Sequence, residues 1–179
     1  MTNDRQVSDR EAGPVVGVPE PFDRFYAREY RRVLALAYGL SGSRSGVEDM
    51  TQESFAAAFR DWDRVGRYGD PGAWVRRVLV NRSVSAWRRR VSELRAVLRL
   101  GGDTRARPVE LDPAVDEVWG EVRRLPKRQA QVVALMYVED RSIEDIAAIL
   151  GCSTGAVKQH LFRARKRLAE RLDEDGGVR

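Results

Sequence analysis

Basic side chains gather in two stretches of this 179-residue sequence, and a third stretch is acidic. Arg76–Arg95 holds seven arginines and one acid, and Ser153–Arg171 holds six basic residues and one acid. Ser43–Asp63 holds five acids and two arginines. Dense guanidinium and ammonium groups bind phosphates, so the basic stretches favour a polyanionic partner such as a nucleic acid. The acidic stretch, taken alone, is typical of a solvated helix face.

Residue types that would support catalysis are scarce. Cys152 is the single cysteine and His160 the single histidine, which excludes an internal disulfide and the usual zinc or iron sites. No nucleophile elbow or Walker loop accompanies them. We therefore expect no catalytic residues, no metal, no cofactor and no small-molecule substrate.

Composition is that of an ordinary globular chain, with 42% apolar residues, 33% charged residues and a net charge of +5. No uninterrupted apolar run approaches the ~18 residues of a membrane span, and the N-terminus lacks the pattern of a secretion signal. We expect a cytoplasmic protein without membrane insertion.

The apolar positions recur at helical spacing, and no strand pattern competes with them. We expect an all-α fold of two small helical domains joined by a flexible linker. The expected boundaries are a disordered tail over 1–21, a first domain over 22–91, a linker over 92–111, a second domain over 112–172 and a tail over 173–179.

Three helices are expected in the first domain. The first begins at Phe22 and is broken by the loop Gly39–Gly46. The second carries Glu48 and Asp49 in its first turn and Trp62 on its apolar stripe. The third opens near Pro71, with apolar residues inward and an arginine-rich outer surface.

The second domain ends in a candidate helix-turn-helix. A helix over Ile143–Leu150, capped by Ser142, is followed by a three-residue turn and a longer basic helix from Thr154. If the apolar side chains of this helix face the core, its outward positions are Gly155, Lys158, Gln159, Arg163 and Lys166. The alternative is an ordinary helical hairpin with a solvated basic face.

Aromatic residues are interleaved with arginines around the third helix. Tyr68 and Trp74 lie among these arginines, and such mixtures bind unpaired bases by stacking. Trp74 also falls at core spacing, so packing is the alternative explanation.

Three segments, in order, resemble one family. These are VEDMTQESFAAAFR at Val47–Arg60, PGAWVRRVLVNRSVSAWRRR at Pro71–Arg90, and Leu125–Leu168 with SIEDIAAILGCSTGAVK and FRARKRL. They resemble the extracytoplasmic-function sigma factors of the sigma-70 family, in particular actinobacterial sigma-E-like members. The likeness extends over about Phe22–Leu172.

The resemblance implies a role for each cluster. Core RNA polymerase, through its beta and beta-prime subunits, would bind Glu48, Asp49, Gln52 and Glu53. The minus-ten promoter element would bind Tyr68, Trp74, Arg77, Asn81, Arg82, Arg88, Arg89 and Arg90. The minus-thirty-five element would bind Ser153, Thr154, Gly155, Lys158, Gln159, Arg163, Arg165 and Lys166.

The function so implied is a subunit that directs core RNA polymerase to promoter DNA and assists promoter opening, under control of an anti-sigma factor. Gln159-His160 departs from the Ser-Arg often found there in the family, so the base preference does not carry over. The alternative is a conventional helix-turn-helix regulator whose N-terminal domain oligomerises or senses a signal.

Overall fold

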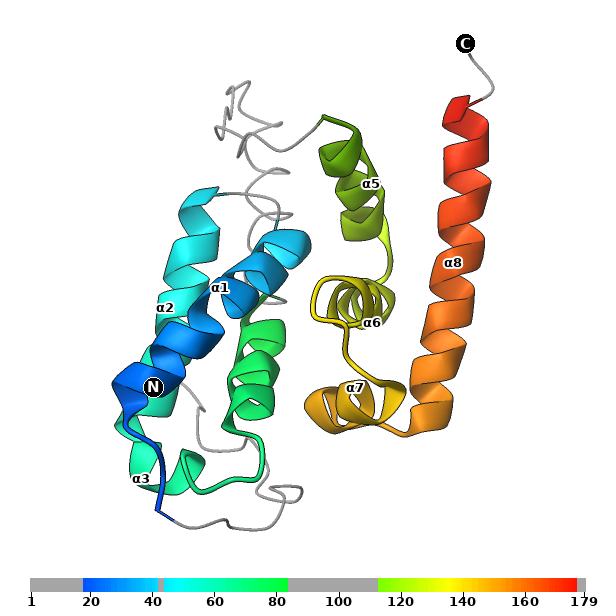
Figure 1. Ribbon diagram of the computed structural model, residues 1–179. Helices are drawn as coiled ribbons and strands as arrows, with labels where there is room; N and C mark the ends of the chain where they lie inside the picture. Colours follow the sequence, from blue (N-terminus) through cyan, green and yellow to red (C-terminus); the bar gives the residue numbers. More distant parts are fainter. Residues whose placement is uncertain (1–17, 42–43, 84–112, 177–179) are drawn as a thin grey trace, which may run out of the picture.

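The computed structural model describes residues 18–41, 44–83 and 113–176, and every regular element in these ranges is helical, as expected. The first half holds α1 (Phe22–Ser41), α2 (Arg44–Arg60), α3 (Trp62–Val65) and a helix over residues 71–83. The second half holds α5 (Pro113–Arg124), α6 (Lys127–Tyr137), α7 (Ile143–Leu150) and α8 (Thr154–Gly176) (Figure 1). The predicted linker over 92–111 and residues 1–17 of the predicted N-terminal tail lie outside the described residues.

Aromatic packing joins α1 to α2. The Phe25 side chain of α1 is fully buried, and its ring centroid lies 5.9 Å from that of Phe55 in α2. Trp62 packs 4.7 Å from the Phe25 ring and donates its indole N–H to the Glu20 carbonyl at 3.0 Å. These contacts hold the segment before α1 against α3 and build the core of the first half.

The predicted helix break at Gly39 is wrong, because α1 runs through this residue to Ser41. Gly39 is buried, and a Cβ atom at this position would lie 3.3 Å from the Trp119 ring of α5. Glycine costs about 1 kcal/mol in a helix interior relative to alanine, but here it permits close approach of another helix. Tertiary packing therefore outweighs the local preference.

The boundaries of α2 also differ from the prediction. The helix begins at Arg44, so its first turn contains no acid, and Glu48 and Asp49 lie in the second turn. It ends at Arg60, and Trp62 begins the separate short helix α3. The acids are therefore available as surface groups rather than as first-turn partners of the helix dipole.

The helix over residues 71–83 begins as predicted near Pro71. The Asp70 side chain accepts a hydrogen bond from the Ala73 N–H at 2.9 Å, which caps the first turn. Val75 and Leu79 are fully buried, as the apolar spacing predicts. Arg76, expected on the outer surface, is also fully buried, because carboxylates from two other segments enclose its guanidinium.

The second half is built around α6, with α7 and α8 packed against it. Val157, Leu161 and Ala164 of α8 are buried, whereas Leu172, which continues the same apolar spacing in the sequence, is 39% exposed. Tyr137, which lies at helical spacing from the buried Val133 of α6, is 58% exposed. The core of this half therefore depends on the first three turns of α8 more than on its end.

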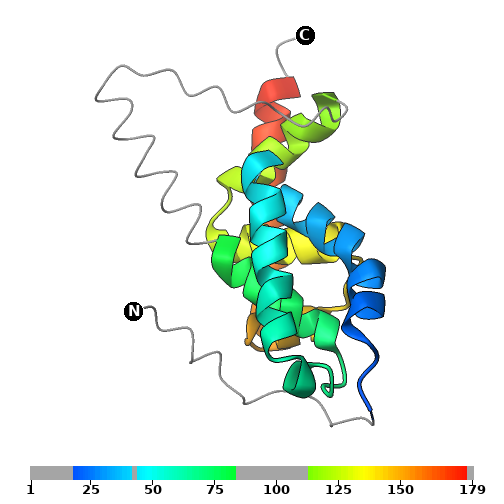
Figure 2. The same cartoon turned by 90° about the vertical axis from the view of Figure 1, so that its left-hand side faces the viewer.

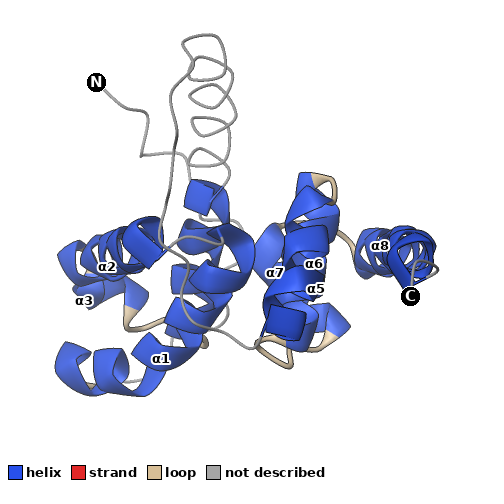
Figure 3. Ribbon diagram, turned by 90° about the horizontal axis from the view of Figure 1, so that it is seen from above, coloured by secondary structure: helices blue, strands red, loops and turns tan. Residues whose placement is uncertain are grey.

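The two halves pack against each other. Helix α1 contacts α5 and α6, and buried residues from both halves form one continuous apolar cluster. Figure 2 shows the molecule from the side of the first half, with α1 and α2 in front of the second half. Seen from above, α2 and α8 lie at opposite sides, with the helices of the junction between them (Figure 3). The expected two sets of helices are present, and they share a packed interface.

Candidate nucleic-acid interface

A capped helix-turn-helix forms the lower part of the second half. The Ser142 hydroxyl accepts from the Asp145 N–H at 3.0 Å, and the Asp145 carboxylate accepts from the Ser142 N–H at 3.4 Å. Gly151 ends α7 with φ 61°, a left-handed conformation that favours glycine. The Ser153 hydroxyl then accepts from the Ala156 N–H at 3.2 Å and caps α8. These caps fix the turn predicted from the sequence.

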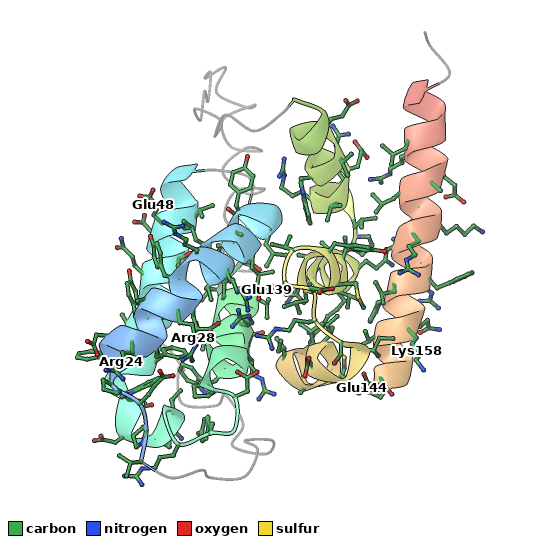
Figure 4. The ribbon with its side chains drawn as sticks, viewed as in Figure 1. Arg24, Arg28, Glu48, Glu139, Glu144 and Lys158 are labelled. Carbon is green, nitrogen blue, oxygen red and sulfur yellow. The ribbon has the colours of Figure 1, made fainter. Side chains whose placement is uncertain are left out.

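The outward face of α8 is accessible over its first three turns. The predicted positions are exposed without exception: Ser153, Thr154, Gly155, Lys158, Gln159, Arg163, Arg165 and Lys166. Lys158 lies near the start of the helix, beside the turn from α7 (Figure 4). A basic helix held at this end by a helix-turn-helix has the geometry that enters the DNA major groove.

Phe162 belongs to the same face and was missed by the sequence reasoning. Its side chain is 70% exposed, and it follows Lys158 by one helical turn. Aromatic groups in the major groove contact the thymine methyl group. The four-residue spacing from Lys158 is the signal that could have placed it there.

Arginines farther along α8 form hydrogen bonds to other residues of the same half of the molecule. The Arg165 guanidinium donates to the Tyr137 hydroxyl at 3.0 Å and lies 5.9 Å from that ring. Arg171 donates to the buried Glu121 carboxylate at 3.3 Å. Positive charge that is available to a ligand is therefore concentrated toward the N-terminal half of the helix.

His160 lies at the edge of this face. Its side chain is partly buried, and its Nδ1 atom is buried without a hydrogen-bond partner among the described residues. Burial lowers the pKa of His160 below its ordinary value of 6.5, and the nearby charges of Arg128 and Arg163 lower the pKa further. The imidazole is therefore neutral at pH 7.

A second candidate surface lies on α2. The predicted residues Glu48, Asp49, Gln52 and Glu53 are exposed, with Glu48 near the upper end of the helix in Figure 4. Phe59, one to two turns beyond Glu53, is 63% exposed, and its ring packs 4.9 Å from Phe22. The apolar spacing of the sequence assigns Phe59 to the inward stripe of this helix, and that assignment is wrong, because the side chain lies on the face that carries Glu48 and Gln52.

The predicted minus-ten residues are not gathered on one open surface. Asn81 is exposed, whereas Tyr68 and Trp74 are half-buried against the core. Arg82 forms an ion pair with Glu53 at 2.6 Å, and Arg77 donates to backbone carbonyls of α7. Arg88, Arg89 and Arg90 lie outside the described residues.

Neither a metal-binding group nor a membrane-spanning helix is found among the described residues. No group of three or more His, Cys, Asp or Glu side chains in this part of the chain is arranged to hold a metal ion. Among the helices described, none has the length and apolar character to cross a membrane.

Comparisons with known proteins agree with this arrangement. Residues 25–93 match the Sigma-70 region 2 family, and residues 116–168 match the Sigma-70 region 4 family. An RNA polymerase sigma-E factor of Streptomyces antibioticus is 30% identical over 135 residues, which cover 75% of each chain. The chain belongs to the extracytoplasmic-function sigma factors of the sigma-70 family. Its first half is the region 2 domain and its second half the region 4 domain.

The sequence similarity to sigma factors extends over most of the chain. The extracytoplasmic-function sigma factor SigM of Mycobacterium tuberculosis is 28% identical over 170 residues, covering 95% of this chain and 86% of that protein. The alternative of a conventional regulator with an N-terminal sensing module is not favoured, because the first half matches region 2. The chain is a sigma factor, an RNA polymerase subunit that directs transcription initiation.

Two solved structures have the same fold. RpoE of Bartonella quintana, in complex with the anti-sigma factor NepR, superposes with a TM-score of 0.70 at 25% identity, over 85% of this chain and 96% of that one. CnrH, in complex with the cytosolic domain of CnrY, superposes with a TM-score of 0.64 at 25% identity, over 86% and 88%. Each superposition therefore includes helices from both domains of this chain.

Proposed function

We propose that this sigma factor uses two opposed surfaces, the acidic face of α2 for core RNA polymerase and the outward face of α8 for the minus-thirty-five element. The observation that carries this assignment is their separation. The two helices lie at opposite sides of the molecule, so one partner does not obstruct the other (Figure 3).

The α2 surface suits a basic protein partner. Asp49 and Gln52 are exposed one turn apart, and the exposed Phe59 ring continues the same helix. Acidic groups steer association with a basic partner, while a buried aromatic at the centre of an interface supplies much of the affinity. We assign Phe59 as the apolar anchor and Asp49 as the steering group for the beta and beta-prime subunits.

The α8 surface suits a duplex. Lys158, Gln159 and Arg163 reach base edges or phosphates, and Phe162 adds an apolar contact. The minus-ten element is assigned to the helix over residues 71–83, where the exposed Asn81 faces solvent beside Arg82. Contacts with extruded bases there would offset an unstacking cost of a few kcal/mol.

In this assignment the protein supplies binding and orientation, while the polymerase supplies the chemistry. It acts in the cytoplasm, where core polymerase and promoter DNA meet. The sigma factor RpoE of Bartonella quintana occurs in complex with an anti-sigma factor, and this chain is assigned a partner of that kind.

The test is run-off transcription with purified core polymerase and genomic promoter fragments, combined with separate binding assays. Lys158→Ala with Arg163→Ala should weaken promoter binding by about tenfold or more, as expected for lost base or phosphate contacts, and leave core affinity unchanged. Asp49→Ala with Phe59→Ala should weaken core binding by a similar factor, about tenfold.

Two features make the comparison specific. Glu53 is left intact, because its replacement would also release Arg82. Glu117→Ala, an exposed acid of α5, is the matched control and should change neither affinity. Absence of core binding and of transcripts on all fragments would contradict the proposed function.

A further inference from the structure

Three arginines lie along the outward side of α1. Arg24, Arg28 and Arg31 follow one another at four- and three-residue steps, which places them on one line of a helix. All three are exposed, whereas Phe25 and Val33 on the other side of the helix are fully buried. Figure 4 shows Arg24 and Arg28 on the N-terminal turns of α1. These three residues form the arginine stripe of α1.

Two charges of the arginine stripe are free of internal partners. The side chains of Arg24 and Arg31 form no hydrogen bond or ion pair with another described residue. Arg28, between them, lies 2.7 Å from Glu20 and 3.1 Å from Glu29. A guanidinium without an internal partner gives up only water when it binds an anion. Arg24 and Arg31 are therefore the groups available to a ligand, whereas Arg28 is already paired.

The acids of α1 leave this face positive. Glu29 is turned inward, where it accepts a hydrogen bond from the buried Arg76 at 2.9 Å. Asp23, the other acid of the helix, lies about 100° around the axis from Arg24. Arg32 is exposed on the opposite flank of the stripe and offsets that charge. The surface therefore favours an anionic partner.

No large apolar side chain accompanies these arginines. The residues beside them on the outward line, Ala27 and Ala35, are small and exposed. Among the described residues, none of the strongly exposed large apolar side chains belongs to α1. Protein interfaces contain an apolar core, often aromatic, and single-stranded DNA binds to exposed aromatic rings. The outward face of α1 offers neither, so it fits the phosphates of a duplex better than a protein or an unpaired strand.

The spacing of the two free arginines matches the rise of one DNA strand. Seven residues at 1.5 Å per residue separate Arg24 from Arg31 by about 10.5 Å along the helix. Successive phosphates of one strand advance about 3.4 Å along the duplex axis, so three steps advance about 10 Å. A helix lying along the duplex can therefore place both guanidinium groups at phosphates of the same strand. The small side chains on this line allow the DNA backbone to approach.

We propose that the arginine stripe of α1 binds the phosphate backbone of duplex DNA without reading its sequence. The site is separate from the surfaces assigned above. Seen from above, the N-terminal turns of α1 lie at one edge of the molecule, away from α8 (Figure 3). Phosphate contacts carry no sequence information, so this site adds similar affinity at every promoter.

The test measures the binding of the full chain to a fluorescent duplex of random sequence, without polymerase, between about 50 and 200 mM salt. Each phosphate contact contributes about 0.9 to the slope of the logarithm of the binding constant against the logarithm of the salt concentration. Arg31→Gln should therefore reduce this slope by about 0.9, and Arg24→Gln with Arg31→Gln should reduce it by about 1.8.

Arg124→Gln is the charge-matched control for Arg31→Gln. Arg124 is an exposed arginine of α5 that forms an ion pair with Glu121. Its replacement changes the net charge of the chain equally but removes no free guanidinium, and Glu121 keeps its contact with Arg171. The slope should stay unchanged in this control. Circular dichroism establishes that each variant is folded.

The contribution of α8 is separated by combining variants. In a Lys158→Ala, Arg163→Ala background, the two α1 substitutions should reduce the slope by the same amount as in the unaltered protein, because the surfaces do not share partners. A much smaller reduction in that background would show that the α1 effect acts through α8 and would overturn the separate site.

Two further outcomes contradict the proposal. An unchanged slope in the folded α1 double variant would overturn the site and would favour an acidic protein as the partner of this face. A single strand of the same sequence is the second probe, and a change of slope for the single strand alone would overturn the assignment to duplex DNA. Neither outcome affects the proposed roles of α2 and α8, which are measured with core polymerase and promoter fragments.

Discussion

Several arginines that the sequence assigns to DNA are already bound within the protein. Arg77 donates to α7, Arg82 pairs with Glu53, and Arg165 donates to Tyr137. An arginine that is already bound within the protein must give up that partner when it binds DNA. It therefore contributes less binding free energy than an arginine that is free in solvent. Lys158 and Arg163, exposed near the start of α8, should therefore contribute more to promoter affinity than Arg165.

His160 should make the stability of the region 4 domain depend on pH. The folded state holds the pKa of His160 below 6.5, so the unfolded state binds a proton more readily. The stability contribution is thus fully present above pH 6.5 and is lost as the pH falls from 6.5 through the lower pKa of the folded state. Urea unfolding at pH 7.5 and pH 5.5 should show lower stability at the acidic pH, and His160→Gln should reduce the difference.

The comparison of pH 7.5 with pH 5.5 reports on His160 because the chain has a single histidine. An equal loss of stability in the parent protein and in His160→Gln would contradict the assignment.

At the scale of elements, local signals located the helix-turn-helix with accuracy. Ser142, Gly151 and Ser153 act through side chains or backbone conformations within a few residues, so their effect is readable from sequence spacing. The ends of α1 and α2 were predicted less well, because Gly39 is held in its helix by Trp119 from a distant segment.

Ser142→Ala should lower the free energy of unfolding by about 1 kcal/mol, because the N–H of Asp145 loses its capping acceptor. Chemical denaturation followed by circular dichroism measures this change. Ser142→Thr retains the hydroxyl and should recover most of the stability. A full loss in Ser142→Thr as well would show that the hydrogen bond is not the source of the effect.

At the scale of the whole molecule, domain closure depends on one small residue. Gly39 allows α1 to approach Trp119, and a larger side chain would meet that ring and Val138. Gly39→Leu should therefore separate the domains and increase the radius of gyration measured by small-angle X-ray scattering from the full chain.

Gly120→Leu is the matched control. Gly120 also lies inside a helix, but the nearest atom to a Cβ there is 4.0 Å away, at the end of the flexible Arg123 side chain. Both substitutions remove a helix glycine, so their local effects are similar. An equal radius for the two variants would contradict the role of Gly39 in closure.

The sequence by itself determined the all-helical class, the two domains and the exposed faces of α2 and α8. These features follow from apolar periodicity, capping residues and local charge, each of which acts over one or two helical turns. Only the tertiary structure decided that Arg76 is buried, that Arg77 caps α7, and that Gly39 lies inside a helix. Their partners lie dozens of residues away, and the spacing of nearby residues carries no information about which distant surface will pack against them.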